Sequence, residues 1–137
     1  MRVASSLGIA VLLAFGAPAA AQTTSDAHEV TFSKDIAPIF QKNCQQCHRP
    51  GSIGPMSLTT YQEVRPWARS IKNRVVTGEM PPYRYDRDIG IQNLKDDLRL
   101  SLSEIEAISS WVDAGAPMGE PADLPPPLSF PDLSEWA

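Results

Sequence analysis

The sequence predicts an all-α protein built from three or four short helices. Three stretches carry apolar residues at helical spacing, each with residues nearby that start or stop a helix. No stretch shows sustained two-residue alternation, which is the pattern typical of a half-buried strand. The sequence also contains no internal repeat.

The first expected helix lies around residue 36. Ser33 can cap its start. Its apolar face consists of Ile36, Ile39 and Phe40. Pro38 complicates the first turn, because a proline ring meets the carbonyl four residues before it. Either the helix begins before Pro38 with a distorted first turn, or Pro38 is itself the first helical residue, and the sequence leaves both open.

A second helical stretch begins around residue 60, and Pro66 occupies a position typical of a first turn. Its apolar stripe consists of Trp67, Ile71 and Val75, which recur every four residues and are most simply interpreted as core. Gly78 is expected to end the helix, because glycine readily adopts the left-handed conformation found after a last turn.

The third expected helix has the clearest signals. Ser103 and Glu106 are expected to form a capping box at its start. Its apolar face consists of Ile105, Ile108 and Val112, with Trp111 beside them. Gly115, followed by Pro117, is expected to stop the helix.

Residues 1–21 have the features of a secretory signal peptide. Arg2 is followed by an apolar run from Leu7 to Phe15, and small residues lead to an expected cleavage site after Ala21. An uncleaved membrane anchor is the alternative, but about nine strongly apolar residues are too few for a spanning helix of about 20. We therefore expect an exported, periplasmic protein without stable membrane insertion after cleavage.

The rest of the chain divides by composition. The expected parts are a polar N-terminal tail at 22–32, a folded domain at 33–117 and a proline-rich C-terminal tail or linker at 118–137. A core of this size is marginal without a disulfide, a metal or a cofactor. The net charge of −4 does not favour nucleic-acid binding.

The sequence CQQCH at residues 44–48 contains the only two cysteines of the chain. A thioredoxin-like redox dithiol needs a βαβ context that the pattern lacks. A structural zinc site needs four ligands, and besides the residues of the motif the chain offers only His28. The motif is instead typical of one covalently attached haem c, in which Cys44 and Cys47 bond to the haem and His48 binds its iron. A redox dithiol remains the minor alternative.

The other axial ligand of the haem iron is expected to be Met80. It follows the helix-ending Gly78 and precedes Pro81, and a residue before proline favours an extended conformation that stiffens the chain there. Core packing is the alternative role for Met80. The other candidates are Met56, expected to pack beside the haem, Met118 in the C-terminal stretch and His28 in the polar tail.

Taken together, residues 30–117 resemble a class I cytochrome c domain. The resemblance rests on an N-terminal helix, CQQCH, the Gly54-Pro55 step, a middle helix, a Met-Pro-Pro loop and a C-terminal helix with an aromatic residue. The chain is also similar to cytochrome c domains that begin larger exported bacterial proteins, some of which continue into a copper monooxygenase-like module. It departs from these where relatives often have tryptophan and histidine and this chain has Tyr83 and Arg84.

The resemblance implies a class I cytochrome c fold, with specific roles for several residues. The implied haem thioethers are at Cys44 and Cys47, and the implied axial ligands are His48 and Met80. The Pro55 carbonyl is expected to accept the imidazole proton of His48. Arg65 and Trp67 are expected near the haem propionates. Phe40 is expected to lie against Trp111 where the first and last helices cross.

These features predict a periplasmic monohaem electron carrier rather than an enzyme, with no catalytic residue. Met/His ligation leaves no open position on the iron and raises the reduction potential. The expected partners are redox proteins. Two alternatives remain open: a haem subunit or front module of a larger oxidoreductase, and a haem peroxidase or sensor with a labile methionine ligand.

Overall fold

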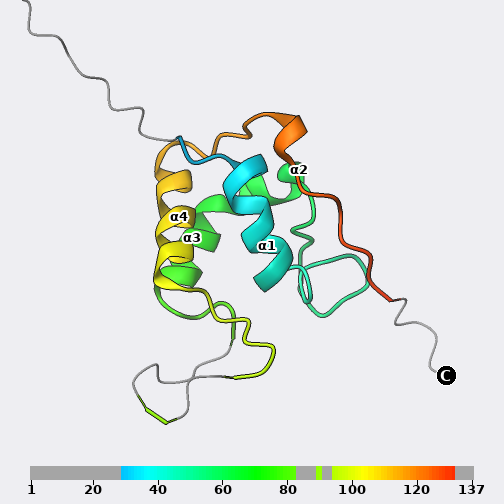
Figure 1. Ribbon diagram of the computed structural model, residues 1–137, viewed down its shortest axis with the longest axis vertical. Coiled ribbons are helices and arrows are strands. Elements are labelled where there is room, and N and C mark those ends of the chain that lie inside the picture. The colour runs from blue at the N-terminus through cyan, green and yellow to red at the C-terminus, as the bar shows by residue number, and fades with distance from the viewer. Residues whose placement is uncertain (1–28, 83–88, 91–93, 132–137) are drawn as a thin grey trace, which may run out of the picture.

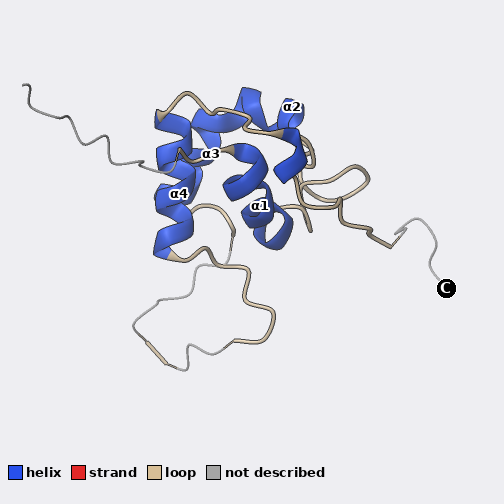
Figure 2. Ribbon diagram, turned by 45° about the horizontal axis from the view of Figure 1, so that its top comes forward, coloured by secondary structure: helices blue, strands red, loops and turns tan. Residues whose placement is uncertain are grey.

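The computed structural model describes residues 29–82, 89–90 and 94–131. Its elements are η1 (Phe32–Ile36), α1 (Ala37–Asn43), α2 (Tyr61–Val64), η2 (Arg65–Trp67), α3 (Ala68–Val76), α4 (Leu102–Asp113) and η3 (Pro121–Asp123) (Figure 1). No strand occurs in these ranges, which confirms the predicted all-α class (Figure 2). The expected signal peptide, His28, Tyr83 and Arg84 lie outside the described residues.

The first helix begins before Pro38 with a widened turn. η1 is a π-helix, in which the N–H of Ala37 donates to the carbonyl of Phe32, five residues earlier. A π turn changes the position of the carbonyls ahead of Pro38, which a regular α-helix would bring against its ring. The predicted Ser33 cap is wrong, because the Ser33 hydroxyl is buried and donates to the Met118 carbonyl at 2.8 Å.

The second helical stretch is a succession of α2, η2 and α3 rather than one helix. It ends as predicted, with Gly78 at a φ of 69°. Ile71 and Val75 are buried, but Trp67 is 45% exposed, so the prediction that Trp67 belongs to the core is wrong. The 3₁₀ turn at η2 advances each residue by more than an α-helix does, which moves Trp67 off the apolar stripe.

The last helix, α4, begins two residues earlier than its predicted cap. Ser101 and Glu104 form the capping box, and not Ser103 and Glu106. The pattern S-x-x-E occurs twice in succession, so the local sequence permits both positions. Leu100, just before the observed cap, is 2% exposed, and its burial favours the earlier start.

Phe32 is the centre of the aromatic core. Its ring centroid lies 6.4 Å from that of Phe40, 5.4 Å from that of Tyr61 and 6.1 Å from that of Trp111. Phe40 and Trp111, expected to lie against each other, are both buried in the same core, and the Phe32 ring contacts each of them. α4 packs against η1 and α3 (Figures 1 and 2).

The expected boundaries of the folded domain are too narrow at both ends. Phe32, placed in the polar tail, is 1% exposed, and its N–H donates to the Pro117 carbonyl at 3.0 Å. Beyond residue 117, the Gln41 side chain donates to the Pro126 carbonyl at 2.9 Å. The part of residues 118–131 expected to be a linker thus packs on the domain. No helix in the described ranges is long and apolar enough to cross a membrane.

Candidate functional site

The CQQCH motif forms a compact turn at the end of α1. The N–H of Cys44 donates to the Phe40 carbonyl at 2.9 Å, which completes the last turn of the helix. The N–H groups of Cys47 and His48 both donate to the Cys44 carbonyl, at 3.2 and 2.9 Å. Both thiols are free and half-buried. The backbone thus holds both thiols and the imidazole on one short, hydrogen-bonded turn.

The Cys44 thiol is not set up as a reactive thiolate. Burial raises the pKa of Cys44 to about 12, with smaller contributions from the nearby charges of Glu104 and Cys47. Redox dithiols and thiolate metal sites use thiols whose pKa is lowered. The protonated thiol is therefore the favoured form of Cys44 at neutral pH.

The imidazole of His48 is oriented by a backbone carbonyl of the following loop. Its Nδ1 atom lies 3.2 Å from the carbonyl oxygen of Met56. The expected acceptor was the carbonyl of Pro55, so the structure corrects this prediction by one residue. When Nδ1 carries the proton and donates it to Met56, the lone pair on Nε2 is available to bind a metal.

The loop between residues 49 and 58 folds back closely onto the CQQCH turn. The N–H of Gly54 donates to the Cys47 carbonyl at 2.7 Å, and the N–H of Leu58 donates to the His48 carbonyl at 3.0 Å. A Cβ atom at Gly54 would lie 2.6 Å from the Cys47 oxygen and 2.7 Å from Nδ1 of His48. Glycine is therefore required at position 54 for the loop to reach the imidazole.

Met80 follows α3 in a turn that is fixed through its backbone. The N–H groups of Glu79 and Met80 donate to the Arg74 carbonyl at 2.9 and 3.1 Å, and the side chains of Arg74 and Glu79 form an ion pair. The Met80 side chain is 40% exposed, so the alternative of core packing is not supported. The end of α1 and the chain leaving α3 lie on the same side of the molecule (Figures 1 and 2).

The other methionines in the described part of the chain have different surroundings. Met56 is half-buried and packs against the core, and its backbone carbonyl oxygen lies 3.2 Å from Nδ1 of His48. Met118 is half-buried beside the first helix, where its carbonyl accepts hydrogen bonds from Ser33.

Arg65 and Trp67, expected near the propionates, are both exposed. Neither side chain has a hydrogen bond or an ion pair within the described residues. The structure therefore leaves both side chains available for a further contact.

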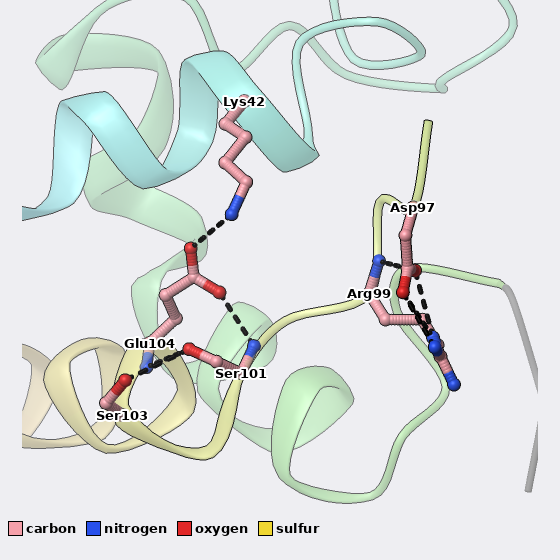
Figure 3. Close-up of polar contacts among 6 residues, drawn as sticks. All are labelled: Lys42, Asp97, Arg99, Ser101, Ser103 and Glu104. Atoms are coloured by element: carbon pink, nitrogen blue, oxygen red, sulfur yellow. Dashed lines mark hydrogen bonds and ion pairs between the residues drawn. The ribbon is translucent and has the colours of Figure 1, made fainter. Parts of the chain in front are cut away.

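Figure 3 shows two ion pairs that sequence patterns did not predict, one between the end of α1 and α4 and one in the segment before α4. Lys42 contacts Glu104 at 3.1 Å, and Asp97 pairs with Arg99 at 2.7 Å. Burial raises the pKa of Glu104, but hydrogen bonds from Ser101 and Lys42 outweigh it and lower the pKa overall. The capping carboxylate of α4 thereby ties that helix to the residue two positions before Cys44. Lys42 and Glu104 are 62 positions apart, and no local pattern predicts the pair.

A pocket of about 1030 Å³ opens between the first helix and the C-terminal stretch. Its lining includes Gln45, Arg49, Tyr61 and Phe130, but neither cysteine, nor His48, nor Met80. The pocket therefore adjoins the CQQCH turn through Gln45 but does not contain the candidate cofactor-binding side chains.

The donor set of the CQQCH site fits a covalently bound haem. Two free thiols on one turn and an imidazole with Nδ1 engaged are groups to which such a cofactor binds. The exposed thioether of Met80, on the chain that leaves α3, is a separate candidate ligand. Among the described residues, no group of three or more His, Cys, Asp or Glu side chains could hold a metal ion by itself. Comparisons with protein-family models, with curated proteins and with solved structures find no match to this chain.

Proposed function

We propose that this protein is a periplasmic monohaem c-type cytochrome that carries single electrons between redox partner proteins. The observation that carries the proposal is the CQQCH turn itself. Both thiols are free on one turn, and the Met56 carbonyl engages Nδ1 of His48, which leaves Nε2 for iron. The all-α fold supports a class I cytochrome c fold as part of the same proposal.

Each residue has a defined role in this proposal. Cys44 and Cys47 would hold haem c through thioethers, and His48 and Met80 would bind its iron. When bound, the haem supplies one-electron transfer. The loop with Gly54 and Met56 fixes the His48 ring, and the Arg74 carbonyl fixes the backbone of Met80. A rigid ligand set suits electron transfer, because the same geometry must serve both oxidation states.

A haem peroxidase or sensor is the second candidate. Only the backbone of Met80 has a hydrogen bond within the described residues, to the Arg74 carbonyl, whereas the His48 ring itself is tied to the loop. In this candidate the Met80 thioether would leave the iron and open a binding position. Arg65 and Trp67 remain candidates for the haem surroundings in both functions.

Intact mass and a visible spectrum test the proposal. The chain is produced together with periplasmic haem-attachment machinery and purified after export. We expect the mass of the chain from Gln22 plus one haem, and low-spin spectra in both oxidation states. A mass without a haem adduct contradicts the proposal. A high-spin ferric spectrum with ready peroxide binding replaces the electron carrier with the peroxidase or sensor.

A further inference from the structure

The C-terminal stretch runs along the first helix and reaches the residue that follows CQQCH. Gln41 of α1 donates a side-chain hydrogen bond to the Pro126 carbonyl at 2.9 Å. Farther along, the guanidinium carbon of Arg49 lies 4.2 Å from the centroid of the Phe130 ring. In both views the stretch, which ends in red in Figure 1, passes the loop that follows α1 (Figures 1 and 2).

Arg49 also contacts the backbone of the CQQCH turn. Its Nη1 atom donates to the Gln46 carbonyl and, at 3.4 Å, to the Gln45 carbonyl. The Gln46 carbonyl accepts a second hydrogen bond from the Ser52 hydroxyl at 3.1 Å. Carbonyls just past a helix end lack intrahelical donors, and a cation there is favoured electrostatically. Arg49 therefore stabilises the two residues that separate Cys44 from Cys47.

We propose that Arg49 and Phe130 form a clasp through which the C-terminal stretch holds the CQQCH turn in position. A guanidinium can stack on an aromatic face while its N–H groups donate in the plane, so one side chain makes both contacts. Arg49 is then a positioning residue for His48, the residue before it. This last step rests on the proposed function, whereas the clasp itself does not.

The composition of the stretch suits this role. Pro125, Pro126 and Pro127 restrict the backbone before folding, which lowers the entropy lost when the stretch is ordered. Phe130 follows three residues later and supplies the aromatic ring. A free linker would not need an aromatic ring packed against the Arg49 guanidinium beside the CQQCH turn. The contact therefore gives the stretch a function within the domain.

Amide hydrogen exchange of the full-length exported protein tests the clasp. The reporters are the N–H groups of His48 and Gly54, which donate to the carbonyls of Cys44 and Cys47. In Phe130→Leu, which removes the ring but keeps an apolar side chain, we expect exchange at both reporters to become about two- to fivefold faster. This is the change that a lost cation–π contact of about 0.5–1 kcal/mol produces. Phe130→Tyr keeps the ring and should exchange like the parent.

Two controls separate positioning from a general loss of stability. The N–H of Ile105 in α4 donates to the Ser101 carbonyl and should exchange at the parent rate in every variant. Arg49→Lys should make amide exchange at His48 faster, as Phe130→Leu does. The double variant should exchange at His48 no faster than Arg49→Lys alone, because both changes break the same contact. Any one of three results would overturn the clasp. The reporters are unprotected in the parent, the exchange rate at His48 is unchanged in Phe130→Leu, or the exchange rate at Ile105 rises as much as that at His48.

The haem content of the same samples is measured separately. A parent that lacks haem but is folded, as protection of the Ile105 N–H shows, contradicts the proposed function, and its exchange at His48 and Gly54 still decides whether the clasp exists. In a parent with haem, the haem-methyl NMR signals of the ferric protein report the orientation of His48. They should shift in Phe130→Leu and return to the parent positions in Phe130→Tyr. Protected reporters with identical haem-methyl signals in all variants would overturn the positioning of His48.

Discussion

Nδ1 of His48 lies 3.2 Å from the carbonyl oxygen of Met56, so the backbone of the loop after CQQCH sets the direction of the imidazole. Only the main chain of Met56 takes part, which means that most side chains at position 56 would preserve the contact. The close approach depends on Gly54, whose N–H donates to the Cys47 carbonyl on the same turn. The geometry of the site is thus determined by a loop rather than by the motif alone.

Gly54→Ala should displace this loop. The added Cβ would lie 2.7 Å from Nδ1 of His48, and relieving such overpacking typically costs about 1–3 kcal/mol. We expect a lower free energy of unfolding in denaturant and a changed haem spectrum. The matched control is Gly51→Asn, at a positive φ of 72° with open space around it, since asparagine tolerates that conformation. Equal stability of Gly54→Ala and the parent would contradict the close approach.

Replacing Cys44 and Cys47 by alanine should leave a largely unfolded chain. The folded part is small for a stable core, and under the proposed function the covalent haem supplies the missing stabilisation. Far-ultraviolet circular dichroism during heating measures this directly. A cooperative thermal transition in the double variant would show that the protein folds without its cofactor.

Under the proposed function, Met80→Ala should free a coordination position of the haem iron and lower the reduction potential. Removing a neutral, soft ligand favours the ferric state, so cyanide should bind to the variant where the parent resists it. Met56→Ala is the matched control and should keep the parent spectrum, because it keeps the backbone carbonyl that accepts the hydrogen bond of His48. A parent that is already high-spin and unaffected by Met80→Ala would assign the ligand role elsewhere.

Glu63→Gln should lower the free energy of unfolding at neutral pH. It should also make that free energy fall less as the pH is lowered. Burial raises the pKa of Glu63, but hydrogen bonds from Thr59, Ser57 and Thr60 outweigh it and lower the pKa to about 2. A lowered folded-state pKa stabilises the protein above the ordinary value of 4.5, and this stability is lost as pH falls toward 2. We expect a loss of about 1 kcal/mol at pH 7, typical of a helix cap. Chemical unfolding from pH 7 to pH 3 measures it, with Glu120→Gln, at an exposed carboxylate, as the control.

Ser101→Ala should destabilise the protein by about 1 kcal/mol, whereas Ser103→Ala should change little. The Ser101 hydroxyl accepts the Glu104 N–H at 3.2 Å, while Ser103 is exposed in the first turn. Thermal unfolding of the two variants compares the capping boxes directly. A larger loss of stability in Ser103→Ala than in Ser101→Ala would instead support the capping box of Ser103 and Glu106 that the sequence predicted.

Short-range signals in the sequence correctly predicted the all-α class and the end of the middle helical stretch at Gly78, because helix periodicity and helix-ending glycines act within a few residues. The helical spacing of apolar residues also predicted the buried face that contains Ile108. The motif CQQCH likewise identified the candidate site, because its spacing places two thiols and an imidazole on one turn whatever the rest of the chain does.

Tertiary structure decided which of several locally acceptable choices the chain adopts. Two successive S-x-x-E patterns permit either cap of α4, and the burial of Leu100 favours the earlier one. Ser33 has the chemistry of a cap but is buried against Met118, 85 positions away, and the ring of Phe32 occupies the centre of the core. The proline-rich C-terminal stretch has the composition of a linker, and only the folded structure shows its contact with Gln41 of the first helix. Local sequence cannot supply these partners, because hydrophobic burial and side-chain hydrogen bonds across the fold depend on residues that only folding brings together.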